Sequence, residues 1–215
     1  MSWNQIAEML LHMLDASKMT LLVFVLTLAF ALPLGMLVAV GRMSKIKIIS
    51  WIIQAYLLVM RGTPLILQLI FFYFAPDLIG IHLTRFQAAI VAFTLNYAAY
   101  FSEIYRGGIE AIPKGQYEAG QVLGMTKNQI FFKVVLLQVV KRIVPPMSNE
   151  IITLVKDTSL ARIIAVYELI WSGQTFVKQG LIWPLFSTGL FFLLFNGVLT
   201  LLFGYIERKL DFFKC

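Results

Sequence analysis

Apolar residues form long uninterrupted runs along this chain, and most charged residues gather between the runs. Residues 19–41, 86–102 and 179–206 contain no Asp, Glu, Lys or Arg, and residues 48–76 are interrupted only by Arg61. An α-helix needs about 20 apolar residues to cross the hydrocarbon core of a bilayer, which is roughly 30 Å thick. These four runs therefore predict membrane-spanning helices.

A fifth apolar segment, residues 143–170, differs from the others because it also carries charged side chains. We predict an all-α integral membrane protein, formed by residues 1–215 as one domain. Its five spans are expected at about 19–41, 49–77, 85–106, 143–165 and 182–206. Apolar residues also recur at helical spacing over residues 3–16, which predicts a separate helix on the outer membrane interface.

The composition agrees with a membrane protein, since 60% of the 215 residues are hydrophobic and 13% are charged. Soluble domains carry about 25% charged residues. A chain of this size cannot bury so much apolar surface in its own core, which argues against a soluble enzyme or a nucleic-acid-binding domain.

Basic residues are distributed unevenly between the two sides of the predicted spans. Of the 18 Lys and Arg, twelve follow the first, third and fifth spans, and three lie on the opposite side. Cytoplasmic loops are enriched in Lys and Arg, so this pattern predicts an external N-terminus and a cytoplasmic C-terminus. The net charge of +7 is then a topology signal and does not indicate nucleic acid as a partner.

The segment 107–142 is long for a connection and is expected to be structured. Residues 115–125 predict a short helix, which Gly124 can end in a left-handed cap. Thr126 can cap a second helix together with Gln129, three residues later. The first helix is expected to expose a partly apolar face made of Tyr117, Gly120, Val122 and Leu123.

Within this segment, Tyr117-Glu118-Ala119-Gly120 followed by Gly124-Met125-Thr126 resembles the EAA loop of ABC-importer permeases. That loop usually has Ala where Gly120 stands and Pro where Leu137 stands. Four more blocks are similar to the polar-amino-acid permeases, so the resemblance covers nearly the whole chain. These blocks are Arg61–Pro64, Glu103–Ile109, Pro145–Glu150 and Lys156–Leu160.

The resemblance implies a permease subunit in a bacterial cytoplasmic (inner) membrane that works with a second copy or a sister permease. Two ATPase subunits would bind the coupling helices of the two permeases, and Glu118 would pair with a basic group of the ATPase. An extracytoplasmic binding protein would deliver a polar amino acid. The chain contains no P-loop sequence, so ATP and Mg²⁺ are expected in the partner ATPase and no cofactor in this chain.

Polar residues inside the predicted spans are candidates for the substrate path, because ionisable groups at membrane depth are costly. On the third span, Asn96, Tyr100 and Glu103 share one helix face. An internal pair between Glu103 and Arg106 is the alternative for that glutamate.

On the fourth span, Glu150 and Asp157 lie two turns apart, and Thr158 follows. Asp157 is predicted to line the path and to favour a positively charged group. The alternative is an internal ion pair with Lys156 or Arg162.

The Arg61–Pro64 sequence should break the second span, since proline lacks an N–H and disfavours helix at the residue before it. The freed carbonyls then need a cavity or a neighbour. The break is either part of a substrate site or a simple kink after an interfacial helix, residues 49–60.

Other functional classes have weaker support. A transition-metal site is not expected, because the chain has two His, both predicted to lie outside the spans, and one Cys. An intramembrane enzyme would need a Ser/His or paired-Asp constellation, and Asp157 is the only Asp well inside a span. A channel would leave the structured 107–142 segment without a role, whereas a permease for another small polar solute stays open.

Overall fold

The computed structural model describes residues 3–178 and 180–211, with the backbone alone for residues 3–8; Cys215 lies outside this range. The described residues form α-helices and shorter helical turns. The α-helices are α1 (Trp3–Arg42), α2 (Lys47–Gly62), α3 (Leu65–Phe74), α4 (Arg85–Glu110), α5 (Lys114–Val122), α6 (Lys127–Ile130), α7 (Leu136–Asp157), α8 (Leu169–Lys178) and α9 (Trp183–Leu210). The other turns are two 3-10 segments, η1 (Pro76–Ile79) and η3 (Thr158–Ile164), and a π-helical segment, η2 (Phe131–Val135).

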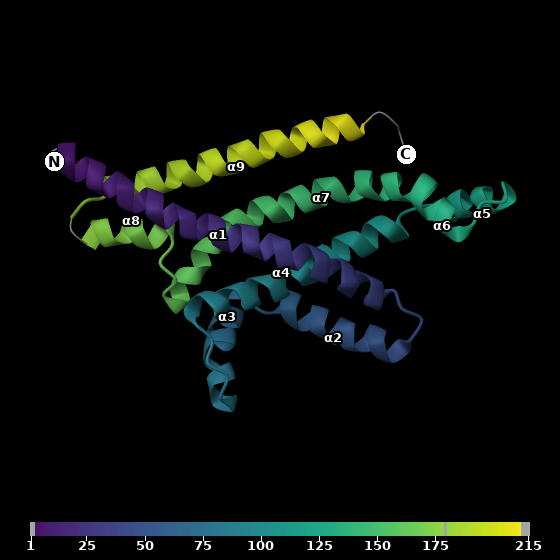
Figure 1. The fold of residues 1–215 in the computed structure, drawn as a ribbon, viewed down its shortest axis with the longest axis horizontal. Coiled ribbons are helices and arrows are strands. Elements are labelled where there is room, and N and C mark those ends of the chain that lie inside the picture. The colour runs from purple at the N-terminus through teal and green to yellow at the C-terminus, as the bar shows by residue number, and fades with distance from the viewer. Residues whose placement is uncertain (1–2, 179, 212–215) are drawn as a thin grey trace.

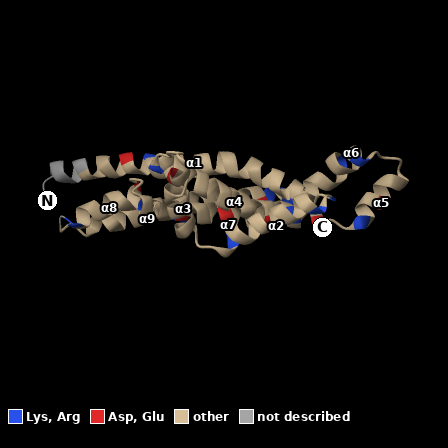
Figure 2. Ribbon diagram, turned by 90° about the horizontal axis from the view of Figure 1, so that it is seen from below, with Lys and Arg blue, Asp and Glu red and all other residues tan. Residues whose placement is uncertain are grey.

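The helices form a narrow bundle in which α1, α4, α7 and α9 run along the long axis (Figure 1). The N-terminus and α8 lie at one end, and the hairpin of α5 and α6 lies at the other. Lys and Arg residues gather mainly in the half that carries this hairpin (Figure 2). The N-terminus and the 107–142 segment are therefore at opposite ends, which the predicted topology requires.

Helix α4 is the centre of the bundle, and its main neighbour is α1. Ala31 of α1 and Ala92 of α4 are completely buried in the main core of the bundle. A Cβ added at Gly35 would lie 3.0 Å from Phe101 Cβ and 3.1 Å from the carbonyl oxygen of Ala98. Small residues allow the two helix backbones to approach closely. In a bilayer, where no hydrophobic effect drives helices together, such close packing stabilises the contact between them.

The prediction of a separate helix at residues 3–16 is wrong, because α1 continues without a break from Trp3 to Arg42. No glycine or proline occurs before Pro33 to interrupt it. The polar residues at the expected junction are accommodated within the helix: Ser17 donates to the carbonyl oxygen of Leu14 at 2.7 Å, and Lys18 pairs with Asp15 at 2.9 Å.

The second predicted span is two helices, α2 and the pair α3–η1, bent by 111° at the break. Among the described residues, Met9–Arg42 and Trp183–Leu210 are each long and apolar enough to cross a membrane, and the bent pair is a third candidate. Helices α4 and α7 are long enough to cross a membrane but are less apolar, because polar and charged residues occur along them.

The helix expected at residues 143–165 begins earlier than predicted and loses its α-helical geometry after Asp157. Segments α6, η2 and α7 follow one another directly, so helical structure extends from Lys127 to Asp157. The second helix of the predicted hairpin and the fourth predicted span are therefore one continuous helical segment. It changes to 3-10 geometry at Thr158, and Ala165, with a positive φ of 56°, ends the helical segment.

Helix α8 was not predicted, although an acidic residue precedes it. The Glu168 carboxylate is fully buried and accepts hydrogen bonds from the backbone N–H groups of Ile170 and Trp171, both at 2.8 Å. Burial raises the pKa of Glu168, and these two amides oppose the shift. Glu168 therefore satisfies N–H groups that the start of a helix otherwise leaves free.

Candidate functional site

Two buried amide side chains satisfy the carbonyl groups that the break between α2 and α3 leaves free. Thr63 precedes Pro64 and has an extended backbone, with φ −117° and ψ 148°. Gln68 Nε2 donates to the carbonyl oxygens of Met60 at 2.9 Å and Thr63 at 3.2 Å. Asn96 Nδ2 donates to the same Met60 oxygen at 3.0 Å and to Gln68 Oε1 at 2.9 Å. The break is thus built into the fold and braced from α4.

This arrangement changes the interpretation of Asn96, which the sequence placed on the substrate path. Its side chain is buried, and Nδ2 already serves two acceptors. Its position is therefore behind the break, where it supports the turn. Sequence reasoning missed Gln68, although an amide within the apolar stretch Leu65–Phe74 was a usable signal.

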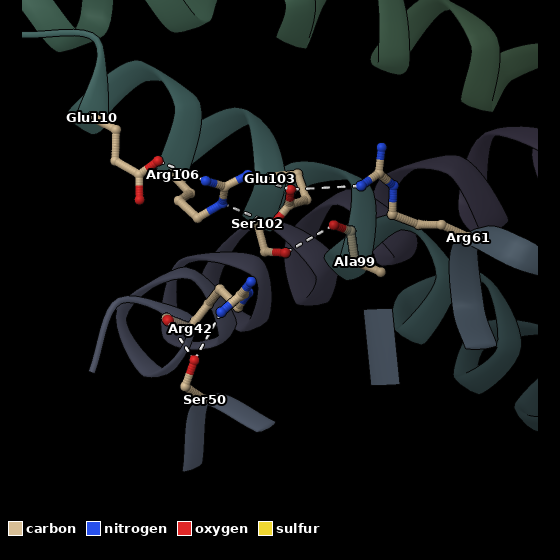
Figure 3. Close-up of polar contacts among 8 residues, drawn as sticks. All are labelled: Arg42, Ser50, Arg61, Ala99, Ser102, Glu103, Arg106 and Glu110. Atoms are coloured by element: carbon tan, nitrogen blue, oxygen red, sulfur yellow. Dashed lines mark hydrogen bonds and ion pairs between the residues drawn. The ribbon is translucent and has the colours of Figure 1, made fainter. Parts of the chain in front are cut away.

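Glu103 is the centre of a line of charges on α4 (Figure 3). Its carboxylate accepts two hydrogen bonds from Arg106, at 3.0 Å and 2.7 Å, so the internal pair named as the alternative for Glu103 is present. Arg106 also donates to Glu110 at 2.6 Å. From the end of α2, Arg61 Nη1 comes within 3.6 Å of Glu103 Oε2, and its guanidinium lies 5.4 Å from the centre of the Tyr100 ring. Tyr100 and Glu103 therefore both meet the broken helix.

Asp157 has a tyrosine as its partner. The Tyr97 hydroxyl donates to Asp157 Oδ2 at 2.7 Å. Within the described part of the chain, neither Lys156 nor Arg162 forms an ion pair with Asp157, so the alternative of a tight internal pair is not what the structure shows. Tyr97 was not among the predicted residues.

Glu150 on α7 and Thr158 at the start of η3 are the other candidates, and they differ in whether their side chains already have a hydrogen-bond partner. Thr158 is buried, and its hydroxyl donates to the carbonyl oxygen of Val155 at 2.7 Å. Glu150 is partly exposed and makes neither a hydrogen bond nor an ion pair with the residues that the structure describes. Of these two, Glu150 is the group free to contact a solute.

The hairpin between α5 and α6 has the predicted turn chemistry. Gly124 has a φ of +71°. The N–H of Met125 donates to the carbonyl oxygen of Gly120 at 3.0 Å, and that of Gly124 donates to Gln121 at 2.9 Å, which is a Schellman motif. Thr126 caps α6, and its reciprocal bonds with Gln129 form the expected capping box.

The apolar surface of the hairpin is smaller than predicted. Gly120 is buried, and a Cβ there would lie 2.6 Å from Ile130 Cγ1, so its lack of a side chain allows α5 to pack against α6. Tyr117 is partly covered by the same small core. Val122 and Leu123, 87% and 78% exposed, form the apolar tip, while Glu118 and Ala119 are also exposed.

These features define a helical membrane protein with a braced broken helix and a structured hairpin at one end. The chain belongs to the family described as the binding-protein-dependent transport system inner membrane component, whose model matches residues 31–212. It is therefore a transporter permease subunit by family.

Curated relatives and a solved structure resemble the chain over most of its length. It is 38% identical to the L-cystine transport system permease protein TcyB of Bacillus subtilis, over 87% of this chain and 81% of that protein. It is 36% identical to the arginine transport system permease protein ArtQ of Bacillus subtilis, over 92% and 91%. A crystal structure of an amino acid ABC transporter with histidines has a TM-score of 0.85 and 28% identity, covering 97% and 99% of the two chains.

Proposed function

We propose that this protein is the permease subunit of an ATP-driven importer and that it carries a polar amino acid across the bacterial inner membrane. The observation that carries the proposal is the hairpin with exposed Val122 and Leu123 at its tip. An exposed apolar tip on a structured hairpin at one end of a membrane bundle is suited to binding a partner protein. The family membership and the amino-acid transport roles named for the relatives support it.

The partner at the hairpin is an ABC ATPase that binds ATP and Mg²⁺, with two ATPases in the complex. The coupling surface consists of Tyr117, Glu118, Ala119, Gly120, Gly124, Met125 and Thr126, of which Gly120 acts through packing. Helix α4 leads into this hairpin, and η2 and α7 continue directly from α6 at its end. Motion of the ATPase would therefore reach both helices that carry the polar residues of the site.

A second permease copy or a sister permease is the proposed neighbour in the membrane. The segment α3–η1 projects sideways from the bundle (Figure 1). Phe71, Phe74, Leu78 and Ile79 on this projection are all at least 60% exposed. Apolar side chains at membrane depth contact either lipid or another membrane helix, and their position on a segment that projects beyond the bundle supports a paired permease. Five spans, an external N-terminus, a cytoplasmic hairpin and an extracytoplasmic binding protein complete the proposal.

The proposed substrate path is lined by Tyr100, Glu103, Glu150 and Asp157, with Asn96 and Thr158 as supports. Carboxylates along a path favour a solute with an ammonium or guanidinium group. A polar amino acid fits this chemistry, and a related small polar solute is the second candidate.

Uptake into membrane vesicles tests the proposal directly. The permease is produced with its ATPase and binding protein, and radiolabelled amino acids are screened with ATP present and absent. We expect saturable uptake of at least one polar amino acid that requires ATP and both partners. Uptake that persists without the ATPase would contradict the importer and favour a channel.

A further inference from the structure

A cavity of about 410 Å³ lies between the end of α1, α2 and α4. Arg42, Arg61, Glu103 and Gln54 supply its polar lining, and Leu57 supplies part of its apolar lining. Arg61 lies next to the break, whereas Arg42 ends α1 near the turn that leads into α2. The cavity therefore extends from the break towards the half of the bundle that carries the hairpin.

Arg61 has unused hydrogen-bonding capacity in this cavity. Its contact with Glu103 is 3.6 Å, which is too long for a hydrogen bond, and it donates no hydrogen bond to any other described residue. Its side chain is 44% exposed. By contrast, Glu103 is held from its own helix by two bonds from Arg106. Arg61 can therefore turn to another acceptor without leaving the Glu103 carboxylate unpaired.

The head group of an α-amino acid carries the two charges that complement this pair. Its carboxylate matches the planar guanidinium of Arg61, which can donate two parallel hydrogen bonds. Its ammonium matches the oxygen of Glu103 that faces Arg61 in Figure 3. The cavity volume is within the range of small-molecule sites, which is about 300–1,000 Å³. The amides that brace the break cannot take this role, because their donors are already engaged.

We propose that this cavity is a transient binding site for the zwitterionic head group of the transported amino acid, between the break and the hairpin end. The proposal rests on the amino-acid import function inferred above. The incoming head group inserts between Arg61 and Glu103 and replaces their loose contact. Because Arg106 keeps its two bonds to Glu103, the contact with Arg61 reforms when the amino acid leaves.

Protection of a single cysteine tests this site without relying on transport. Gln54→Cys is introduced with Cys215→Ser, which removes the only native cysteine, and thiol labelling of the assembled complex is followed in nanodiscs. L-glutamine and L-arginine serve as probes, with their α-carboxamides as matched compounds that lack the carboxylate. We expect at least one of the amino acids to slow labelling and its amide to have no effect.

Variants of Arg61 separate binding from misfolding. Arg61→Gln should require about tenfold more amino acid for the same protection, because a charge-assisted contact is lost. Arg61→Lys should retain part of the protection, and Lys47→Gln, at the exposed opposite end of α2, should behave like the parent.

Equal protection by the amide, no protection by either amino acid, or protection unchanged by Arg61→Gln would overturn the site. Protection that follows anionic lipid content instead of amino acid would also overturn it and reassign the cavity to a lipid head group. ATP-dependent uptake by the same complex is measured separately. Its absence counts against the importer, whereas normal uptake without protection counts only against this cavity.

Discussion

The Tyr97 hydroxyl on α4 donates a 2.7 Å hydrogen bond to Asp157 Oδ2 at the end of α7. These residues are sixty positions apart, and their helices are the two that flank the α5–α6 hairpin. The bond therefore ties together, far from the hairpin, the two helices through which a docked ATPase would act.

Asp157→Asn should keep the assembled complex but weaken transport of a cationic or zwitterionic amino acid. Asparagine can still accept the Tyr97 hydrogen bond, whereas the charge is lost. A lost charge-assisted contact is worth about 1.5–3 kcal/mol, so we expect more than a tenfold decrease in apparent affinity, measured as the concentration dependence of uptake.

Tyr97→Phe is the matched variant, because it removes the hydrogen bond and leaves the carboxylate. We expect it to lower the thermal stability of the complex, since Asp157 loses its donor. If Asp157→Asn and Tyr97→Phe both leave uptake and stability unchanged, Asp157 has neither role.

Gly124→Val should uncouple the ATPase from transport. A side chain at a φ of +71° costs about 1–2 kcal/mol and disturbs the turn that sets α5 against α6. Gly115→Val is the control, because Gly115 lies in the first turn of α5 without a positive φ. ATPase copurification and the ratio of ATP hydrolysed to solute transported provide the measurement. Normal coupling in Gly124→Val would show that the hairpin is not the coupling element.

Gly35→Leu should destabilise the fold by about 1–3 kcal/mol, because the added atoms would overlap Phe101 and the Ala98 backbone at the α1–α4 contact. Gly197→Leu on α9 is the control, since a Cβ there meets no atom within 4 Å. Thermal unfolding of the purified variants measures the difference. Equal stability of the two variants would mean that α1 and α4 are less closely packed than the structure indicates.

Single cysteines at Lys127 and Asp77, in a Cys215→Ser background, should react with a membrane-impermeant thiol reagent from opposite sides. Lys127 begins α6 in the hairpin, and Asp77 lies in η1 after α3. Reaction of position 127 in intact cells would reverse the proposed orientation.

The sequence was sufficient for the features that depend on local chemistry. Uninterrupted apolar runs indicated an all-helical membrane protein, and the Thr63–Pro64 pair indicated the broken helix. Gly124, Thr126 and Gln129 specified the hairpin turn, because a left-handed cap and a capping box involve residues only a few positions apart. The i,i+3 spacing of Glu103 and Arg106 was likewise enough to suggest their ion pair.

Contacts between distant segments were decided only by the tertiary structure. Sequence spacing could suggest that Asn96 faces a path, but the fold places it against Gln68 and the carbonyl oxygen of Met60. It also gives Asp157 a tyrosine on another helix and turns Gly120 towards Ile130. Helical periodicity defines the face on which a residue lies, whereas the angle and rotation of the helices define what that face meets. For this reason the sequence suggested several polar candidates but missed Gln68 and Tyr97, and only the fold showed which side chains brace the break and which make no internal hydrogen bond among the described residues.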